Sequence, residues 1–147
     1  MSKEELKIGE ASLPRFEYRT FGQNFDNAAK RMARFSVPIP EKVWERVSEE
    51  IYILSRTNDI NNTKIRDGKM DIKTYVQTVK GLEQWNPLMK GEFPMDVEVL
   101  KNEVFPAFQV AMPEFSKAVY TFDEFIDMVK QHPDLQAIRV KKQRFGY

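Results

Sequence analysis

The residues best suited to chemistry in this chain are cations that recur at alternate positions. They fall at three places: Lys64 and Arg66, then Lys73, then Lys142 and Arg144. Side chains two apart lie on one face of a β-strand, so each such pair presents its charge on a single surface. Cations that converge on one surface are either solvated or hold an anion. Arg and Lys hold phosphate oxygens through charge-assisted hydrogen bonds.

The stretch from Glu49 to Tyr75 must position the central cations. Its apolar residues alternate, which is typical of half-buried antiparallel strands. Asp67-Gly68 accepts the positive φ angles of a tight turn, so residues 63–66 are predicted to pair with 69–76 as a hairpin. One face of this hairpin is then polar, and it carries Lys64 and Arg66 on the first strand and Lys69, Asp71, Lys73 and Tyr75 on the second.

The rest of the chain predicts an α+β fold, with a meandering antiparallel sheet that curls toward a barrel. Residues 1–13 are expected to form a loose tail, and 14–147 a single domain. The expected elements are a strand at 15–21, a helix at 25–35, a short helix through Val43, Trp44 and Val47, a strand or strand pair within 78–93 broken by Gly81, Asn86-Pro87 and Gly91, a helix at 96–105 ended by Pro106, a helix opened by the capping box Thr121–Glu124, and a strand at 135–147.

Composition limits the function classes. The 23 Lys and Arg nearly balance the 22 Asp and Glu, so a general affinity for nucleic acid is not indicated. The chain has no Cys and one His, His132, which excludes a disulfide framework, a thiolate nucleophile and a His-rich zinc site. His132 is expected to be a cap or surface residue. With no apolar stretch of membrane-spanning length, a soluble cytoplasmic protein is expected.

These residues resemble the CYTH domain, the triphosphate tunnel superfamily that includes inorganic triphosphatases, thiamine triphosphatase and class IV adenylate cyclase. The family's motifs stand here in the same order: Glu17-Tyr-Arg19 for the opening Glu-x-Glu-x-Lys, Tyr52 on an aromatic-rich strand, Lys64-Ile-Arg66 for Arg-x-Arg, Lys73 as an inward Lys, Glu83 as a later acidic residue, and Lys142-Gln-Arg144 for Lys-x-Arg. The chain departs from the family at Arg15, where the first acid is missing. The family's closing Glu-x-Glu strand has no counterpart before Tyr147, so either the given sequence is truncated or the expected tunnel is incomplete.

The resemblance implies a barrel or tunnel with flanking helices that binds triphosphate, polyphosphate or a nucleotide, and a metal-dependent triphosphatase activity. The implied phosphate-binding residues are Arg19, Lys64, Arg66, Lys73, Lys142 and Arg144. Glu17 and Glu83 are the implied ligands of Mg²⁺ or Mn²⁺, which would take carboxylate and phosphate oxygens together.

Other readings of the same residues stay open. The cations can line a solvated sheet face, Glu17 can form a cross-strand ion pair, and Lys142 and Arg144 can be an ordinary basic tail. A non-catalytic module is the alternative function, with a nucleotide, polyphosphate or protein partner on the same sheet. A third alternative is binding of single-stranded nucleic acid, in which Tyr18, Tyr52 and Tyr75 stack on bases. The near-neutral net charge disfavours this alternative.

Overall fold

The computed structural model describes residues 15–35 and 44–146 of the chain. The chain divides into two compact units. Of the described residues, the larger unit holds 15–18 and 50–140, and the smaller unit holds 19–35, 44–49 and 141–146. The tail expected at 1–13 lies outside the described residues. The single domain expected at 14–147 stays a prediction.

A run of consecutive strands is followed by a run of short helices, which is typical of an α+β fold. In chain order they are β1 (Arg15–Glu17), α1 (Asp26–Phe35), β2 (Trp44–Ser55), β3 (Asn61–Arg66), β4 (Lys69–Val79), β5 (Leu82–Glu92), β6 (Met95–Asp96), α2 (Val97–Val99), the π-helical turn η2 (Leu100–Val104), α3 (Phe105–Phe108), β7 (Val119–Tyr120), α4 (Phe122–Gln131) and β8 (Leu135–Gly146).

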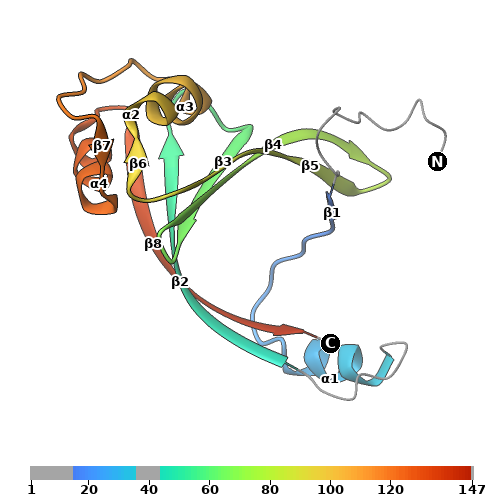
Figure 1. The fold of residues 1–147 in the computed structure, drawn as a ribbon. Coiled ribbons are helices and arrows are strands. Elements are labelled where there is room, and N and C mark those ends of the chain that lie inside the picture. The colour runs from blue at the N-terminus through green and yellow to red at the C-terminus, as the bar shows by residue number, and fades with distance from the viewer. Residues whose placement is uncertain (1–14, 36–43, 147) are drawn as a thin grey trace. The chain divides into compact units, whose positions relative to one another are not determined.

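Six strands form one antiparallel sheet in the order β1-β5-β4-β3-β2-β8, and β6 pairs separately with β7. In the larger unit this sheet curls strongly into a half-barrel, and α2, α3 and α4 lie against one of its faces (Figure 1). The prediction of an α+β fold with a curled antiparallel sheet and flanking helices is therefore confirmed.

Two tight turns set the register of the central strands. Asp67 and Gly68 adopt φ angles of 52° and 70°, and β3 pairs with β4 as predicted, from Asn61↔Thr74 to Arg66↔Lys69. The next hairpin turns at Lys80 and Gly81, with φ angles of 51° and 79°. A side chain with a β-carbon rarely adopts such angles, so glycine at each turn relieves strain that a second non-glycine residue would add.

The hydrophobic core lies between the sheet and the helices of the larger unit. On β3 and β4 the buried side chains alternate with polar ones, so a single face of the sheet contributes Ile65, Met70 and Ile72. Phe105 and Phe125 from α3 and α4 are fully buried against one another, with ring centroids 6.2 Å apart. This alternation leaves the opposite face of the strands to the polar residues.

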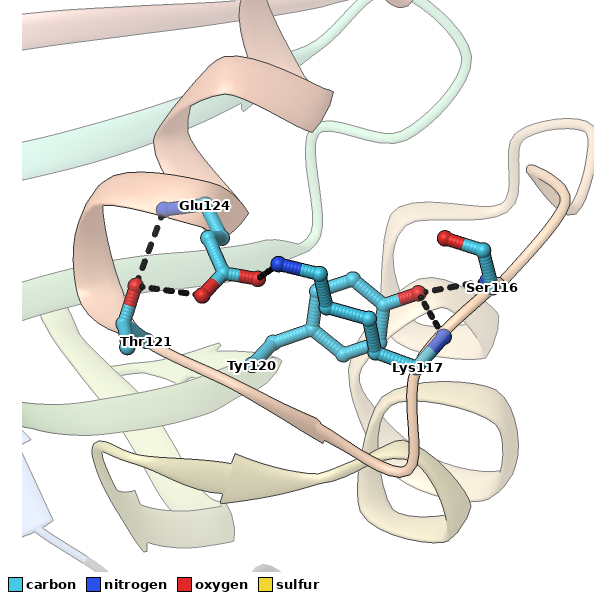
Figure 2. A network of polar contacts seen from close by, with 5 residues as sticks. All are labelled: Ser116, Lys117, Tyr120, Thr121 and Glu124. Carbon is cyan, nitrogen blue, oxygen red and sulfur yellow. Dashed lines mark hydrogen bonds and ion pairs between the residues drawn. The ribbon is translucent and has the colours of Figure 1, made fainter.

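The capping box predicted at Thr121 opens α4. The Glu124 amide donates to Thr121 Oγ1 at 3.3 Å, and the Thr121 hydroxyl donates to Glu124 Oε1 at 3.2 Å (Figure 2). Lys117 Nζ donates to Glu124 Oε2 at 2.6 Å. This hydrogen bond lowers the pKa of Glu124 and raises the pKa of Lys117. The Tyr120 hydroxyl accepts from the Ser116 and Lys117 amides, which fixes the chain that leads into the helix.

Three strand predictions need correction. The short helix expected through Trp44 and Val47 is wrong, because β2 begins at Trp44 and runs on to Ser55; aromatic and β-branched residues favour extended backbone. The strand expected at 15–21 ends at Glu17. Glu17 pairs with Glu83 on β5, and β5 has only one residue before Glu83, namely Leu82, so residues after Glu17 have almost no strand to pair with. Asn86-Pro87 does not break β5, because a bulge beside Pro87 accommodates the missing N–H.

The helix expected at 96–105 does not end at Pro106. The Phe105 amide donates to Leu100 O, five residues back, and Pro106 lies in the first turn of α3. Because the π turn has already left the usual i to i−4 pattern, a residue without an N–H is accommodated there. The helical run therefore continues to Phe108 and carries its apolar side chains into the core.

The smaller unit contains α1, which confirms the helix predicted at 25–35. None of its residues is buried, and the apolar Phe25, Met32 and Phe35 are at least half exposed. The candidate site therefore depends on the larger unit. In the described ranges no helix has both the length and the apolar character needed to cross a membrane.

Candidate functional site

The face of the sheet opposite the core gathers the central cations that the sequence singled out. Cross-strand register aligns Tyr52 with Lys64 and Lys64 with Asp71, and Asn62 with Lys73. We call this surface the polar face; it comprises Glu50 and Tyr52 on β2, Asn62, Lys64 and Arg66 on β3, Lys69, Asp71 and Lys73 on β4, and Lys90 and Glu92 on β5.

The acidic member that sequence reasoning missed is Glu50. Its residue is only 3% exposed, its Oε2 accepts from the Tyr52 hydroxyl at 2.8 Å, and its Oε1 accepts from Arg66 Nη1 at 3.4 Å. A buried carboxylate is tolerated only with such partners. Arg66 is thus half of an ion pair as well as a candidate for phosphate. The available signal was alternation, since Glu50 stands two residues before Tyr52 on the same strand face.

Lys64 is the cation most affected by its surroundings. Partial burial lowers its pKa below the usual value, and the positive charges of Arg66 and Lys73 act in the same direction. Glu50 and Asp71 oppose this effect by favouring the charged form. The five charges therefore interact across neighbouring strands, as the predicted polar face requires.

Lys73 and Asp71 show how charge is distributed along β4. Lys73 lies between Asn62 on β3 and Pro87 on β5, so neither of its cross-strand neighbours is acidic. Asp71 lies between Lys64 and Lys90, and its Oδ1 is buried without a hydrogen-bond partner in the described part of the chain. Cross-strand pairing with an acid therefore does not explain the position of Lys73.

The two residues assigned to a metal, Glu17 and Glu83, lie directly opposite each other on β1 and β5. Glu83 Oε2 also accepts from the Trp85 indole N–H at 3.0 Å. Two carboxylates facing each other repel, and a divalent cation would relieve that repulsion. Mg²⁺ is commonly bound by one or two carboxylates together with phosphate oxygens, so this pair fits the donor set of such an ion.

The distance between this acidic pair and the central cations follows from the register. Glu83 lies opposite Thr78, and Thr78 is roughly 16 Å along β4 from Lys73 at about 3.3 Å per residue. Among the described residues, no group of three or more His, Cys, Asp or Glu is arranged to hold a metal ion. The acidic pair and the cations therefore share a sheet but occupy different parts of it.

Three of the predicted phosphate ligands belong to the smaller unit. Arg19 follows β1 outside any strand, and Lys142 and Arg144 alternate on the last part of β8. Between them, Gln143 donates to Glu45, and the neighbouring Lys141 pairs with Glu49 at 3.8 Å. That Arg19, Lys142 and Arg144 join Lys64, Arg66 and Lys73 stays a prediction.

Comparison of the chain with protein-family models, with curated proteins and with solved structures found no match. The CYTH resemblance rests on the quoted motifs. The structure supports its coarser part, a six-stranded antiparallel half-barrel with a few helices.

Proposed function

We propose that the polar face binds a phosphate-rich anion, either a triphosphate, a polyphosphate or a nucleotide, with Lys64, Arg66 and Lys73 as its central contacts. The observation that carries this proposal is their register on one face of the sheet, opposite the face that contributes Ile65, Met70 and Ile72 to the core. The polar face holds five cationic and three acidic residues, whereas the whole chain has a net charge of +1. Positive charge is thus concentrated on this surface.

The electrostatics of Lys64 support an anionic ligand. Partial burial disfavours its charged form most, Arg66 and Lys73 add to this effect, and Glu50 and Asp71 oppose it. A phosphate group placed beside Lys64 would offset these effects and accept charge-assisted hydrogen bonds from Lys64 and Lys73. Arg66 would contribute from the side of its guanidinium group that Glu50 does not engage. A ligand with several phosphates can make more of these contacts at once than a monophosphate can.

Hydrolysis is the second part of the proposal and depends on a metal. Glu17 and Glu83 would hold Mg²⁺ or Mn²⁺, which neutralises phosphate oxygens and makes phosphorus more open to attack by water. The central cations would hold the remaining phosphates and orient the chain of the ligand. The CYTH resemblance also implies Arg19, Lys142 and Arg144 as phosphate ligands.

The alternative is a non-catalytic binding module on the same face. It is favoured by the separation along β4 between Lys73 and the row that contains Glu83. In this alternative a nucleotide, polyphosphate or protein partner binds the cations, and Glu17 and Glu83 play no chemical role.

Thermal denaturation with phosphate ligands tests the binding proposal. A ligand that binds only the folded state raises the melting temperature, so tripolyphosphate should raise it more than monophosphate at equal ionic strength. Lys73→Gln should remove most of this difference, whereas Lys130→Gln on α4 should leave it intact. Equal shifts with tripolyphosphate, sulfate and chloride would reduce the effect to screening and overturn the proposal.

Phosphate release tests the catalytic part separately. Tripolyphosphate or a nucleoside triphosphate should release phosphate with Mg²⁺ or Mn²⁺ and not with EDTA. Glu83→Gln should abolish release while Glu92→Gln, which removes an acid at the other end of β5, should not. Binding without release under any of these conditions would select the non-catalytic module.

A further inference from the structure

A second candidate site lies on the other side of the sheet, between the strands and the helical run. It is a cavity of about 310 Å³ in the larger unit. Its wall is formed by the start of β3, the middle of β5, η2 and α3. Small-molecule sites in proteins begin at about this volume. The cavity contains none of the residues of the polar face.

Two irregular backbone segments meet at this cavity. On β5, Met89 pairs with Ile72 and Pro87 pairs with Lys73, which leaves Leu88 as the extra residue of a bulge. Leu88 lines the cavity and is 49% exposed. The opposite wall includes Asn102 and Glu103 from the π-helical turn η2. Bulges and π turns each re-aim side chains and occur often beside functional sites.

The orientation of Asn61 in the cavity wall follows from its hydrogen bonds. Its Nδ2 donates to the Ala107 carbonyl at 2.9 Å, and Asn58 Nδ2 donates to the same oxygen at 3.1 Å. Because a carbonyl oxygen only accepts, the amide nitrogen of Asn61 must point toward Ala107. Its Oδ1 therefore points elsewhere, and it is buried with no hydrogen-bond partner in the described residues.

The polar groups of the wall share one chemical property, since they offer acceptors. Glu103 offers a carboxylate. Asn102 uses its Nδ2 to donate to Glu98 Oε2 at 3.3 Å, which leaves its Oδ1 as an acceptor. No Lys, Arg or His lines the cavity. Leu88, Met89 and Pro106 supply the apolar part of the wall.

We propose that this cavity binds a small organic cation with an apolar body, such as an aryl- or alkylammonium. The ammonium group donates to the Glu103 carboxylate and to Asn102 Oδ1, while the apolar body packs against Leu88, Met89 and Pro106. Such a cation supplies the donors that the wall lacks and balances the negative charge of Glu103.

Three probes of similar shape and different charge test the proposal. Benzylamine, benzyl alcohol and benzoate are titrated separately into the ¹⁵N-labelled full chain, and amide shifts are followed by NMR. Benzylamine should produce saturable shifts centred on Asn61, Leu88 and Glu103. Benzyl alcohol should bind more weakly, and benzoate should produce no saturable shifts there. Equal responses to benzylamine and benzoate, or no saturable shifts with benzylamine, would overturn the proposal.

Two variants and a control test the residues. Glu103→Gln should weaken benzylamine binding about tenfold or more and leave benzyl alcohol binding nearly unchanged, since one charge-assisted contact is lost. Leu88→Arg should abolish benzylamine binding by placing a guanidinium at the cavity, and because Leu88 is 49% exposed, the variant should remain folded. Glu114→Gln removes an exposed acid outside the cavity and should bind as the parent does. Unchanged benzylamine affinity in Glu103→Gln would refute the assignment.

Discussion

The two faces of the half-barrel use the same strands for opposite chemistry. On β3, Lys64 and Arg66 lie on the polar face, whereas Asn61 lines the cavity on the helix side. The polar face follows regular strand alternation, and the cavity depends on a bulge and a π turn. Regular pairing thus assembles a row of cations, while the cavity takes Leu88 from a bulge and Glu103 from a π turn.

The largest expected effect concerns the ion pair that anchors the polar face. Arg66→Gln should lower the free energy of unfolding by about 1–3 kcal/mol, because the buried Glu50 loses its charged partner. Urea denaturation measures this loss. Arg66 is partly exposed, so solvent moderates the effect. Lys73→Gln is the matched control and should change stability little. A fully stable Arg66→Gln would show that Glu50 does not need Arg66 and that the cation is available for a ligand.

The next effect concerns ligand affinity on the polar face. Lys73→Gln should weaken tripolyphosphate binding roughly tenfold or more, which corresponds to the loss of one charge-assisted contact of about 1.5–3 kcal/mol. Calorimetric titration measures the change, with Lys130→Gln as the control cation on α4. If both variants bind tripolyphosphate with the same affinity, the polar face attracts anions only through nonspecific charge. It would then not be a binding site to set against the cavity.

A smaller effect is the proton taken up when an anion binds beside Lys64. Its pKa is lowered from 10.5, so between the lowered value and 10.5 the unfolded chain holds more protons than the folded one. Without ligand, the stability contributed through Lys64 therefore rises with pH across that window. A bound phosphate favours the charged form and raises the pKa of Lys64, so binding at alkaline pH should consume part of a proton. Titrations in two buffers of different ionisation enthalpy measure this uptake.

The variant Lys64→Met provides the control for that experiment. This variant should remove the proton uptake. It should still bind the phosphate ligand, with lower affinity than the parent. Proton release on binding, or equal uptake in the variant, would place the linked proton on another group.

Much of the polar face could be predicted because it depends on local rules. An Asp-Gly turn fixes the hairpin register, and alternation then places Lys64 beside Asp71 and leaves Ile65 and Ile72 to the core. Glu50 was missed because its burial depends on two hydrogen-bond partners. Tyr52 lies on the same strand, β2, and Arg66 lies on the neighbouring strand, β3. A sequence pattern marks Glu50 only as one more charged strand residue.

The cavity could not be predicted, since its walls on β5 and on the helical run each break a local rule. Pro87 and Pro106 both suggested ends of elements, yet β5 passes through one and the helical run passes through the other. Both continue because a neighbouring irregularity, the extra Leu88 or the π turn, absorbs the missing N–H. Such compensation depends on tertiary pairing, and no window of sequence contains it.

The last prediction is that the two sites act independently, although β3 and β5 contribute to both. Glu103→Gln should leave tripolyphosphate affinity unchanged, and Lys73→Gln should leave benzylamine affinity unchanged, each within about 0.5 kcal/mol as for separate sites without shared partners. Calorimetry of the two single variants and the double variant measures this. A larger coupling would mean that a ligand on one face changes the strands that form the other. The opposite chemistry of the two faces would then belong to a single coupled site that spans the sheet.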